Sequence, residues 1–206
     1  MTAPAALTVP CTPTESSFHT GPWRLGTGRP TGPRGTRAVI EVRVDDLAFY
    51  EGEAIVRPVN ADLGAPTPLL RRLEAAAGDG LRDQLRKQES LAVGSAVVST
   101  AGALPVELMV HAVVSSDDEP VSTHSVRRAL RSALDRTIDW QIGVVAIAPF
   151  GLGAGNLAIE DSAAVMAEVL ADHVGRGARY PEAITVVAET DEEASVLSQS
   201  LREKGL

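Results

Sequence analysis

Hydrophobic residues follow two alternating patterns from position 38 to the end of the chain. Short stretches rich in valine and isoleucine predict strands, because β-branched side chains pack well on a pleated surface. Between them, apolar residues recur at every third or fourth position, which is typical of amphipathic helices. The predicted strands are 39–44, 54–59, 96–98, 107–114, 142–148 and 183–188. The predicted helices are 69–77, 81–85, 126–138, 159–174 and a final helix that follows a capping box at 190–193.

This order of elements predicts an α/β fold. Strands that alternate with helices of this length build a sheet covered by helices on both faces. We expect a three-layer α/β/α sandwich with a mixed, mainly parallel six-stranded sheet. The segment 142–148 is almost wholly apolar, as expected for a strand with both faces covered. Pro58 has no backbone N–H, so we expect it to end the second strand or to place that strand at a sheet edge.

Residues 1–37 have a different composition from the rest of the chain. They hold six of the thirteen prolines, five glycines and eight threonines, with no sustained apolar period. Four arginines against one glutamate give this segment a net charge of +3, which leaves −11 for the rest of the chain. We predict a flexible Pro/Gly/Thr-rich N-terminal arm at 1–37 and one domain at 38–206. The arm is interpreted as a solvated linker, with an anion-binding tail as the alternative.

Composition and charge exclude several classes of function. With 44% hydrophobic and 22% charged residues, the 206-residue chain resembles an ordinary globular protein. A net charge of −8 argues against general nucleic-acid binding, and no apolar stretch is long enough to span a membrane. Cys11 is the only cysteine, which excludes a disulfide framework and a cysteine-based zinc site. We see no secretory signal and expect a cytoplasmic protein without a metal or cofactor.

The main candidate site follows the strand at 142–148, where the chain reads Pro149-Phe-Gly-Leu-Gly-Ala-Gly-Asn-Leu157. In sheets of this kind, ligands bind beyond the carboxyl ends of the strands. Gly151, Gly153 and Gly155 permit positive φ angles, so that backbone N–H groups can converge on an anion. The next helix begins just after the loop and adds partial positive charge. The loop therefore suits a phosphate or diphosphate, with a glycine-bearing turn without a ligand as the alternative.

Four other positions carry candidate chemistry. Asn60 follows the second strand and can hydrogen-bond a sugar hydroxyl, whereas Asp46 follows the first strand and can accept from an adenine amino group or a ribose hydroxyl. Both residue types are also common in turns and caps. Phe150 borders the glycine loop and is expected either to line a pocket or to pack in the core. His111 lies in an apolar strand, where a hydrogen-bonded core histidine is expected rather than a metal ligand.

The succession of these segments resembles the macro domain, an ADP-ribose-binding family. The resemblance runs from about residue 39 to about residue 201, and it rests on the order and spacing of several motifs. The matching segments are Val44-Asp-Asp-Leu47, Glu53-Ala-Ile-Val-Arg-Pro-Val-Asn60, Ala76-Ala-Gly78, Gly94-Ser-Ala96, Leu104-Pro-Val-Glu-Leu-Met-Val-His111 and Gly151-Leu-Gly-Ala-Gly-Asn-Leu157.

The resemblance implies a site for ADP-ribose or a related nucleotide diphosphate. Asp46 matches the aspartate that contacts adenine in the family, and Asn60 matches the last asparagine of the family's N-A-A-N motif, near the distal ribose. The glycine loop matches the loop that cradles the diphosphate. The implied ligand-binding residues are Asp46, Leu47, Asn60, Phe150, Gly151, Leu152, Gly153, Ala154, Gly155 and Asn156.

The chain departs from the family pattern at the distal half of that site. Arg57 replaces the first asparagine of N-A-A-N, and Ala65-Pro-Thr-Pro68 replaces the family's glycine run, with prolines that lack N–H donors. The aspartate of the hydrolytic members aligns at about Leu70. We therefore expect a divergent binding module without catalytic residues. The alternatives are a macro-like domain without a ligand that serves an assembly role, with homo-oligomers as one form, and an ADP-ribosyl hydrolase.

Overall fold

The computed structural model describes residues 38–153 and 156–206, so the arm predicted at 1–37 lies outside the described residues. No helix within these described segments is long and apolar enough to cross a membrane. In chain order, the elements are β1 (Val39–Val44), the 3₁₀ helix η1 (Leu47–Phe49), β2 (Ala54–Asn60), α1 (Pro68–Ala77), α2 (Asp79–Leu85), β3 (Ala96–Thr100), β4 (Leu108–Ser115), α3 (Thr123–Asp139), β5 (Val144–Ile147), α4 (Ile159–Gly175), β6 (Ala183–Ala188) and α5 (Asp191–Glu203).

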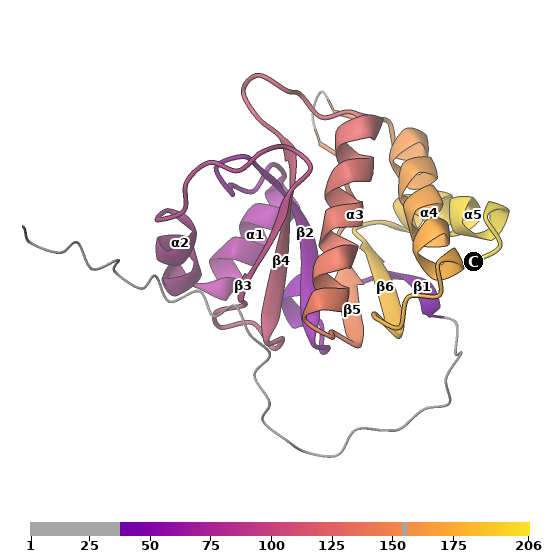
Figure 1. The fold of residues 1–206 in the computed structure, drawn as a ribbon, viewed down its shortest axis with the longest axis horizontal. Coiled ribbons are helices and arrows are strands. Elements are labelled where there is room, and N and C mark those ends of the chain that lie inside the picture. The colour runs from indigo at the N-terminus through magenta and orange to yellow at the C-terminus, as the bar shows by residue number, and fades with distance from the viewer. Residues whose placement is uncertain (1–37, 154–155) are drawn as a thin grey trace, which may run out of the picture. The chain divides into compact units, whose positions relative to one another are not determined.

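The strands form one six-stranded sheet in the order β1-β6-β5-β2-β4-β3. All neighbouring strands are parallel except β3, which runs antiparallel to β4 at one edge. The predicted mixed, mainly parallel α/β fold is therefore confirmed. Because five strands share one direction, their carboxyl ends meet at the same edge of the sheet, and the loops after β2 and β4 lie together at the top of Figure 1.

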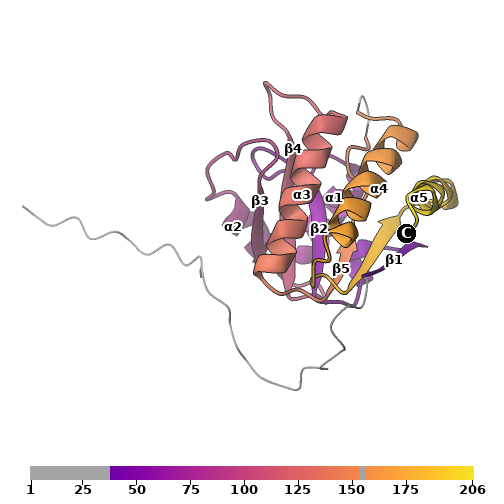
Figure 2. The same ribbon diagram turned by 45° about the vertical axis from the view of Figure 1, so that its right-hand side comes forward.

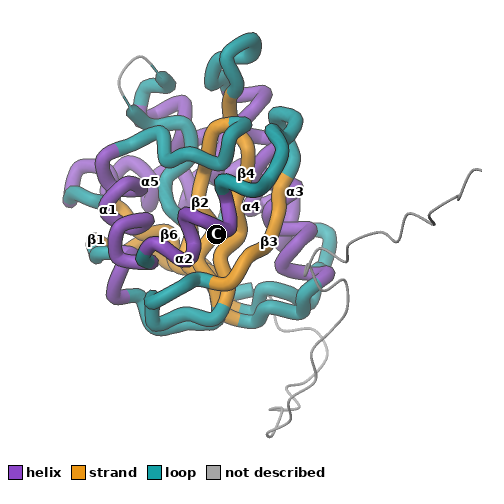
Figure 3. Tube along the Cα trace, turned by 90° about the vertical axis from the view of Figure 1, so that its left-hand side faces the viewer, coloured by secondary structure: helices purple, strands orange, loops and turns teal. Residues whose placement is uncertain are grey.

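Helices cover both faces of the sheet. Residues of α3, α4 and α5 pack on one face, and residues of α1, α2 and η1 pack on the other. Figure 3 shows α1 and α3 on opposite sides of the sheet. Figure 2 shows α5 beside α4 on their shared face. In α3, Val126, Leu130 and Leu134 recur every fourth residue and are fully buried, as the period predicted. The central strands β2 and β4 are therefore buried on both faces, which accounts for their apolar composition.

Pro58 lies inside a central strand, so the expectation that it ends β2 or lies at a sheet edge is wrong. β2 continues to Asn60 and lies between β5 and β4. Alternate residues of a strand direct their backbone groups to the same neighbour, and the carbonyl of Val56 accepts from the amide of Ala148 on the β5 side (3.0 Å). The nitrogen of Pro58 therefore faces the chain beyond Ile147, the last β5 residue paired with β2, so no β2–β5 pair needs the N–H that proline lacks.

Candidate functional site

The glycine loop joins β5 to α4 at the carboxyl edge of the sheet. Gly151 has φ +81° and Gly153 has φ +130°, so two of the three glycines adopt the backbone conformation predicted for them. A Cβ atom at Gly151 would lie 2.9 Å from Val126 Cγ2 and 2.9 Å from Leu157 Cδ1, which leaves room only for glycine. The predictions for Ala154 and Gly155 lie outside the described residues.

Several polar groups of the loop hydrogen-bond within the loop itself. The amide of Asn156 donates to the carbonyl of Gly153 (3.1 Å), and the amide of Leu157 donates to the carbonyl of Gly151 (3.0 Å). The side-chain amide of Asn156 donates to the carbonyl of Leu152 (3.2 Å). Within the described part of the chain, the amides of Leu152 and Gly153 have no hydrogen-bond partner. The amide of Gly151 also has no partner there, but Gly151 is buried, whereas Leu152 is half-buried and Gly153 is exposed, so the last two amides are the ones that an anion can reach.

Phe150 anchors the loop to α4. Its side chain is fully buried in the core, which agrees with the packing interpretation. Its carbonyl accepts from Ser162 Oγ (2.6 Å), and its amide points at Met166 Sδ (3.3 Å). Because α4 supplies both partners, the start of the loop is fixed to the helix whose N-terminus lies beside it.

Asp46 and Leu47 form the turn after β1. One carboxylate oxygen of Asp46, Oδ1, accepts from the amide of Ala48 (2.9 Å), so the aspartate caps η1. Its other oxygen has no partner among the described residues, and the side chain is exposed. Leu47 is fully buried and fixes the turn in the core. Phe49 ends η1, three residues after Asp46, and is 75% exposed.

Asn60 ends β2 at the same edge. Its Oδ1 accepts from Ser115 Oγ at the end of β4 (3.0 Å), and its side-chain nitrogen has no partner in the described part of the chain. In the sheet, β1 is three strands away from β2, with β6 and β5 between them. At the usual strand spacing, Asp46 and Asn60 are therefore separated by about 14 Å, with the glycine loop between them. This edge presents its polar groups in a line that suits an extended ligand.

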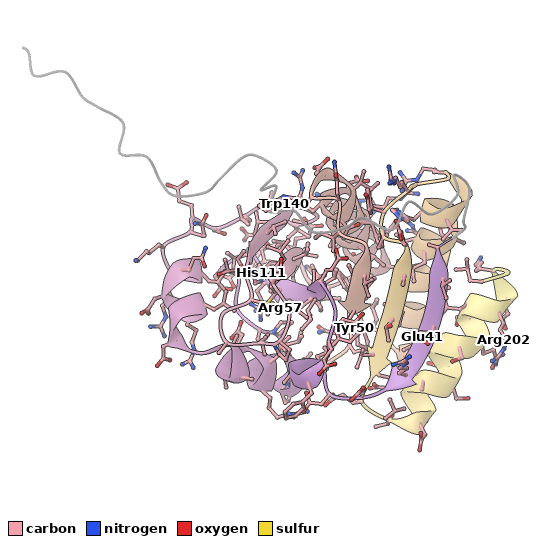
Figure 4. The ribbon with its side chains drawn as sticks, turned by 90° about the horizontal axis from the view of Figure 1, so that it is seen from below. Glu41, Tyr50, Arg57, His111, Trp140 and Arg202 are labelled. Carbon is pink, nitrogen blue, oxygen red and sulfur yellow. The ribbon has the colours of Figure 1, made fainter. Side chains whose placement is uncertain are left out.

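A buried polar network surrounds Arg57, which lies three residues before Asn60 in β2. Arg57 is fully buried in β2 on the α1 face of the sheet and bonds groups from three different segments. Its Nη1 contacts Glu74 Oε1 of α1 (2.6 Å), its Nε donates to His111 Nδ1 of β4 (3.0 Å), and its Nη2 donates to the carbonyl of Leu63 in the β2–α1 loop (3.4 Å). Figure 4 shows Arg57 and His111 side by side inside the domain.

The network fixes the protonation of His111, which is the hydrogen-bonded core histidine that the sequence predicted. A guanidinium can only donate, so His111 Nδ1 must accept from Arg57 and the proton must lie on Nε2. That nitrogen is 2.7 Å from Ser99 Oγ, which donates in turn to the carbonyl of Thr100. Burial, and then the Arg57 cation, hold the pKa of His111 well below its ordinary value of 6.5. Burial also lowers the pKa of Arg57, against the opposing effect of Glu74.

Sequence reasoning identified Arg57 only as a departure from a motif and did not find its partners. An arginine within the apolar stretch 54–59 is itself a signal, because a buried cation needs an anion or several acceptors. Glu74 lies 17 residues further along the chain, and Ser99 lies 12 residues before His111. No local spacing distinguishes these partners from other polar residues.

Comparison with known proteins agrees with this fold. The family model described as Macro domain matches residues 56–166, which include Asn60 and the whole glycine loop. An uncharacterised protein of Aeropyrum pernix is 27% identical over 168 residues, a match that covers 80% of this chain and 86% of that protein. An uncharacterised protein of Mycobacterium bovis is 25% identical over 134 residues, and this match covers 65% of the chain but 37% of that longer protein.

Solved structures share the same architecture. A variant of the Oceanobacillus iheyensis macrodomain superposes with a TM-score of 0.73 at 16% identity, covering 82% of this chain and 94% of the other. The Trypanosoma brucei macrodomain in complex with ADP-ribose superposes with a TM-score of 0.70 at 13% identity, covering 78% of this chain and 68% of the other. At such low identities, these similarities concern the fold.

Proposed function

We propose that this chain, which belongs to the macro domain family, binds ADP-ribose or a closely related nucleoside diphosphate across the carboxyl edge of its sheet. In this proposal the adenine lies at Asp46, the diphosphate lies on the glycine loop, and the distal ribose lies beside Asn60. The ADP-ribose complex of the Trypanosoma brucei macrodomain, which shares the fold, supports the choice of ligand.

The observation that carries the proposal is the order of polar groups along this edge. A carboxylate oxygen of Asp46, the amides of Leu152 and Gly153, and the side-chain nitrogen of Asn60 all lack partners among the described residues. They follow β1, β5 and β2, so their order matches an acceptor for a base amino group, donors for a diphosphate and a donor for a sugar hydroxyl. A smaller ligand such as free phosphate would use only the amides of Leu152 and Gly153 and would leave Asp46 and Asn60 without a role.

The electrostatics favour recognition through neutral donors. The first turn of α4 contains the exposed carboxylates Glu160 and Asp161, which offset the positive end of the helix dipole. The amides of the glycine loop therefore supply the main attraction for the diphosphate. We therefore expect the affinity for the ligand to depend only weakly on salt concentration. A site built from arginines and lysines would show a stronger dependence.

Calorimetric titration with ADP-ribose and with ADP tests the proposal. Gly153→Glu places a carboxylate where the diphosphate would lie and should weaken ADP-ribose binding by about 100-fold or more. Gly177→Glu is the matched control, because Gly177 also has a positive φ (+67°) but has open space around it, in the turn after α4. Absence of both heat and a thermal shift for the unmodified chain at millimolar ADP-ribose would overturn the proposal.

A further inference from the structure

We propose that Arg57 is a positioning residue of the candidate site: it fixes the β2–α1 loop, residues 61–67, in one conformation beside the glycine loop before any ligand arrives. The effect of this fixed loop on ligand choice rests on the proposed function, whereas its rigidity can be measured without a ligand. Arg57 is fully buried, so it is not itself placed to contact a ligand. It acts through the Leu63 carbonyl and through Glu74.

The contacts of Arg57 connect the middle of the loop to two strands and to the helix that follows the loop. Leu63 lies in the middle of the loop, and Glu74 belongs to α1, the helix that follows it. His111 belongs to β4, the neighbour of β2 in the sheet. A planar guanidinium with its donors in a fixed fork can satisfy all three acceptors at once, which a lysine ammonium on a flexible stem cannot do in the same geometry. The loop therefore has little freedom to move relative to the sheet.

Leu63 has a backbone conformation that is unfavourable for a residue with a side chain. Its φ is +65°, a conformation that costs a residue with a side chain roughly 1–2 kcal/mol. Three features over-determine this conformation: a buried side chain, a carbonyl bonded to Arg57, and an amide that donates to the carbonyl of Asn60 (2.8 Å). Strained backbone that is held in this way clusters at binding sites. The same hydrogen bond connects Leu63 to a residue of the candidate site.

The loop ends against the glycine loop. A Cβ atom at Gly153 would lie 3.4 Å from Thr67 Cγ2, so the two loops approach each other at this point. Thr67 also caps α1, where its Oγ1 accepts from the amide of Leu70 (3.3 Å). Pro66 and Pro68 flank it and restrict the backbone on both sides. The part of the ligand beyond the diphosphate therefore meets a wall of fixed shape.

Amide hydrogen exchange of the unmodified chain gives the first test. Ala61 donates to Ser115 and Leu63 donates to Asn60, so both amides report on the loop. We expect them to exchange within about tenfold of the amides of β2, because the loop should open only when the sheet does. Exchange of these two amides many orders of magnitude faster than that of β2 would contradict the proposal, and this result needs no variant to fold.

Two sets of variants give the second test. Arg57→Lys retains the charge without the fork, and the double variant Arg57→Met with Glu74→Gln removes the charge from both partners. Each should speed exchange at Ala61 and Leu63 by about 100-fold relative to the amides of β6, which measure global destabilisation. Arg131→Met with Asp172→Asn is the control, because it removes a surface ion pair of 2.6 Å between α3 and α4.

Ligand affinity separates positioning from simple stabilisation. If the loop faces only the distal part of the ligand, the Arg57 variants should weaken ADP-ribose by about tenfold more than ADP. The variants could instead weaken ADP-ribose and ADP equally and speed amide exchange by the same factor in the loop and in all strands. That result would show that Arg57 only stabilises the fold. If the unmodified chain binds neither ligand but its loop is protected and loosens in the variants, the proposed function fails and the fixed loop stands.

Discussion

Arg57 and His111 are two fully buried ionisable residues on the adjacent strands β2 and β4. Their arrangement is consistent only with a neutral histidine, since the Nδ1 of His111 accepts from Arg57 and a second cation would lie 3.0 Å from the first. The network therefore contains one cation and one anion, Arg57 and Glu74, and its histidine relays a hydrogen bond to Ser99. Such a histidine is a structural group and cannot act as a proton acceptor for a substrate.

This arrangement predicts how stability depends on pH. The folded-state pKa of His111 lies well below 6.5, so the unfolded chain takes up a proton there at a pH at which the folded chain does not. The contribution of His111 to stability is complete above about pH 6.5 and is lost as the pH falls below it, by about 1.4 kcal/mol per pH unit. Urea unfolding between pH 5 and pH 8 should show this slope, and His111→Gln should reduce it.

His173 provides the comparison for that slope. Its pKa is also lowered, mainly by burial, so His173→Gln should remove its own, separate share of the pH dependence. The difference between the unmodified chain and each single variant isolates one histidine. A slope that is unchanged in His111→Gln would show that His111 is protonated in the folded state, contrary to the hydrogen-bond geometry.

Gly151 is a second residue whose identity follows from its surroundings. A side chain there must adopt a positive φ and must displace Val126 or Leu157, so Gly151→Ala should cost about 2–4 kcal/mol of unfolding free energy. Gly177→Ala has a positive φ but open space, and it should cost only about 1–2 kcal/mol. Urea unfolding of the two variants measures the difference, and equal costs would show that the loop relaxes around an added methyl group.

Among the elements, α4 holds the start of the glycine loop through the side chains of Ser162 and Met166, and the Ser162 hydroxyl makes the shorter contact. Ser162 Oγ is buried and donates to the carbonyl of Phe150 at 2.6 Å, so Ser162→Ala leaves that carbonyl without a partner. We expect a loss of about 1–3 kcal/mol in unfolding free energy. Ser195→Ala on the exposed side of α5 should change stability by less than about 0.5 kcal/mol. If both variants unfold at the same urea concentration, the hydroxyl does not anchor the loop.

The elements themselves were predictable because their signals are local. The apolar period placed Val126, Leu130 and Leu134 on the buried side of α3, and Thr190 caps α5 by accepting from the amide of Glu193, as its motif predicted. The interpretation of Pro58 failed for a reason that lies outside the local sequence. Whether a missing N–H is costly depends on where the neighbouring strand ends, and β5 ends before that position.

At the scale of the whole molecule, the strand order β1-β6-β5-β2-β4-β3 is what brings the candidate groups together. Asp46 and Asn60 are close in sequence, but the strands β5 and β6 that separate them in space come from the second half of the chain. The pattern of apolar residues contains no information on this order. Only the succession of motifs, compared with a known family, indicated that Asp46, Asn60 and the glycine loop belong to one site, and the partners of Arg57 were not indicated even by that comparison.

The domain boundary predicted at residue 38 can be tested by deletion. β1 begins with a hydrogen bond from the amide of Val39 to the carbonyl of Glu182 (2.9 Å), and it pairs with β6 along its whole length. Deleting residues 1–37 leaves this strand intact, and the composition of that segment predicts little buried surface, so the melting temperature should change by less than about 3 °C. Deleting residues 1–44 removes β1 with the packed side chains of Ile40 and Val42, and it should lower the melting temperature by more than about 10 °C. Thermal unfolding followed by circular dichroism distinguishes the two deletions. A large drop for the shorter deletion would place part of the folded core before residue 38, against the proposed boundary.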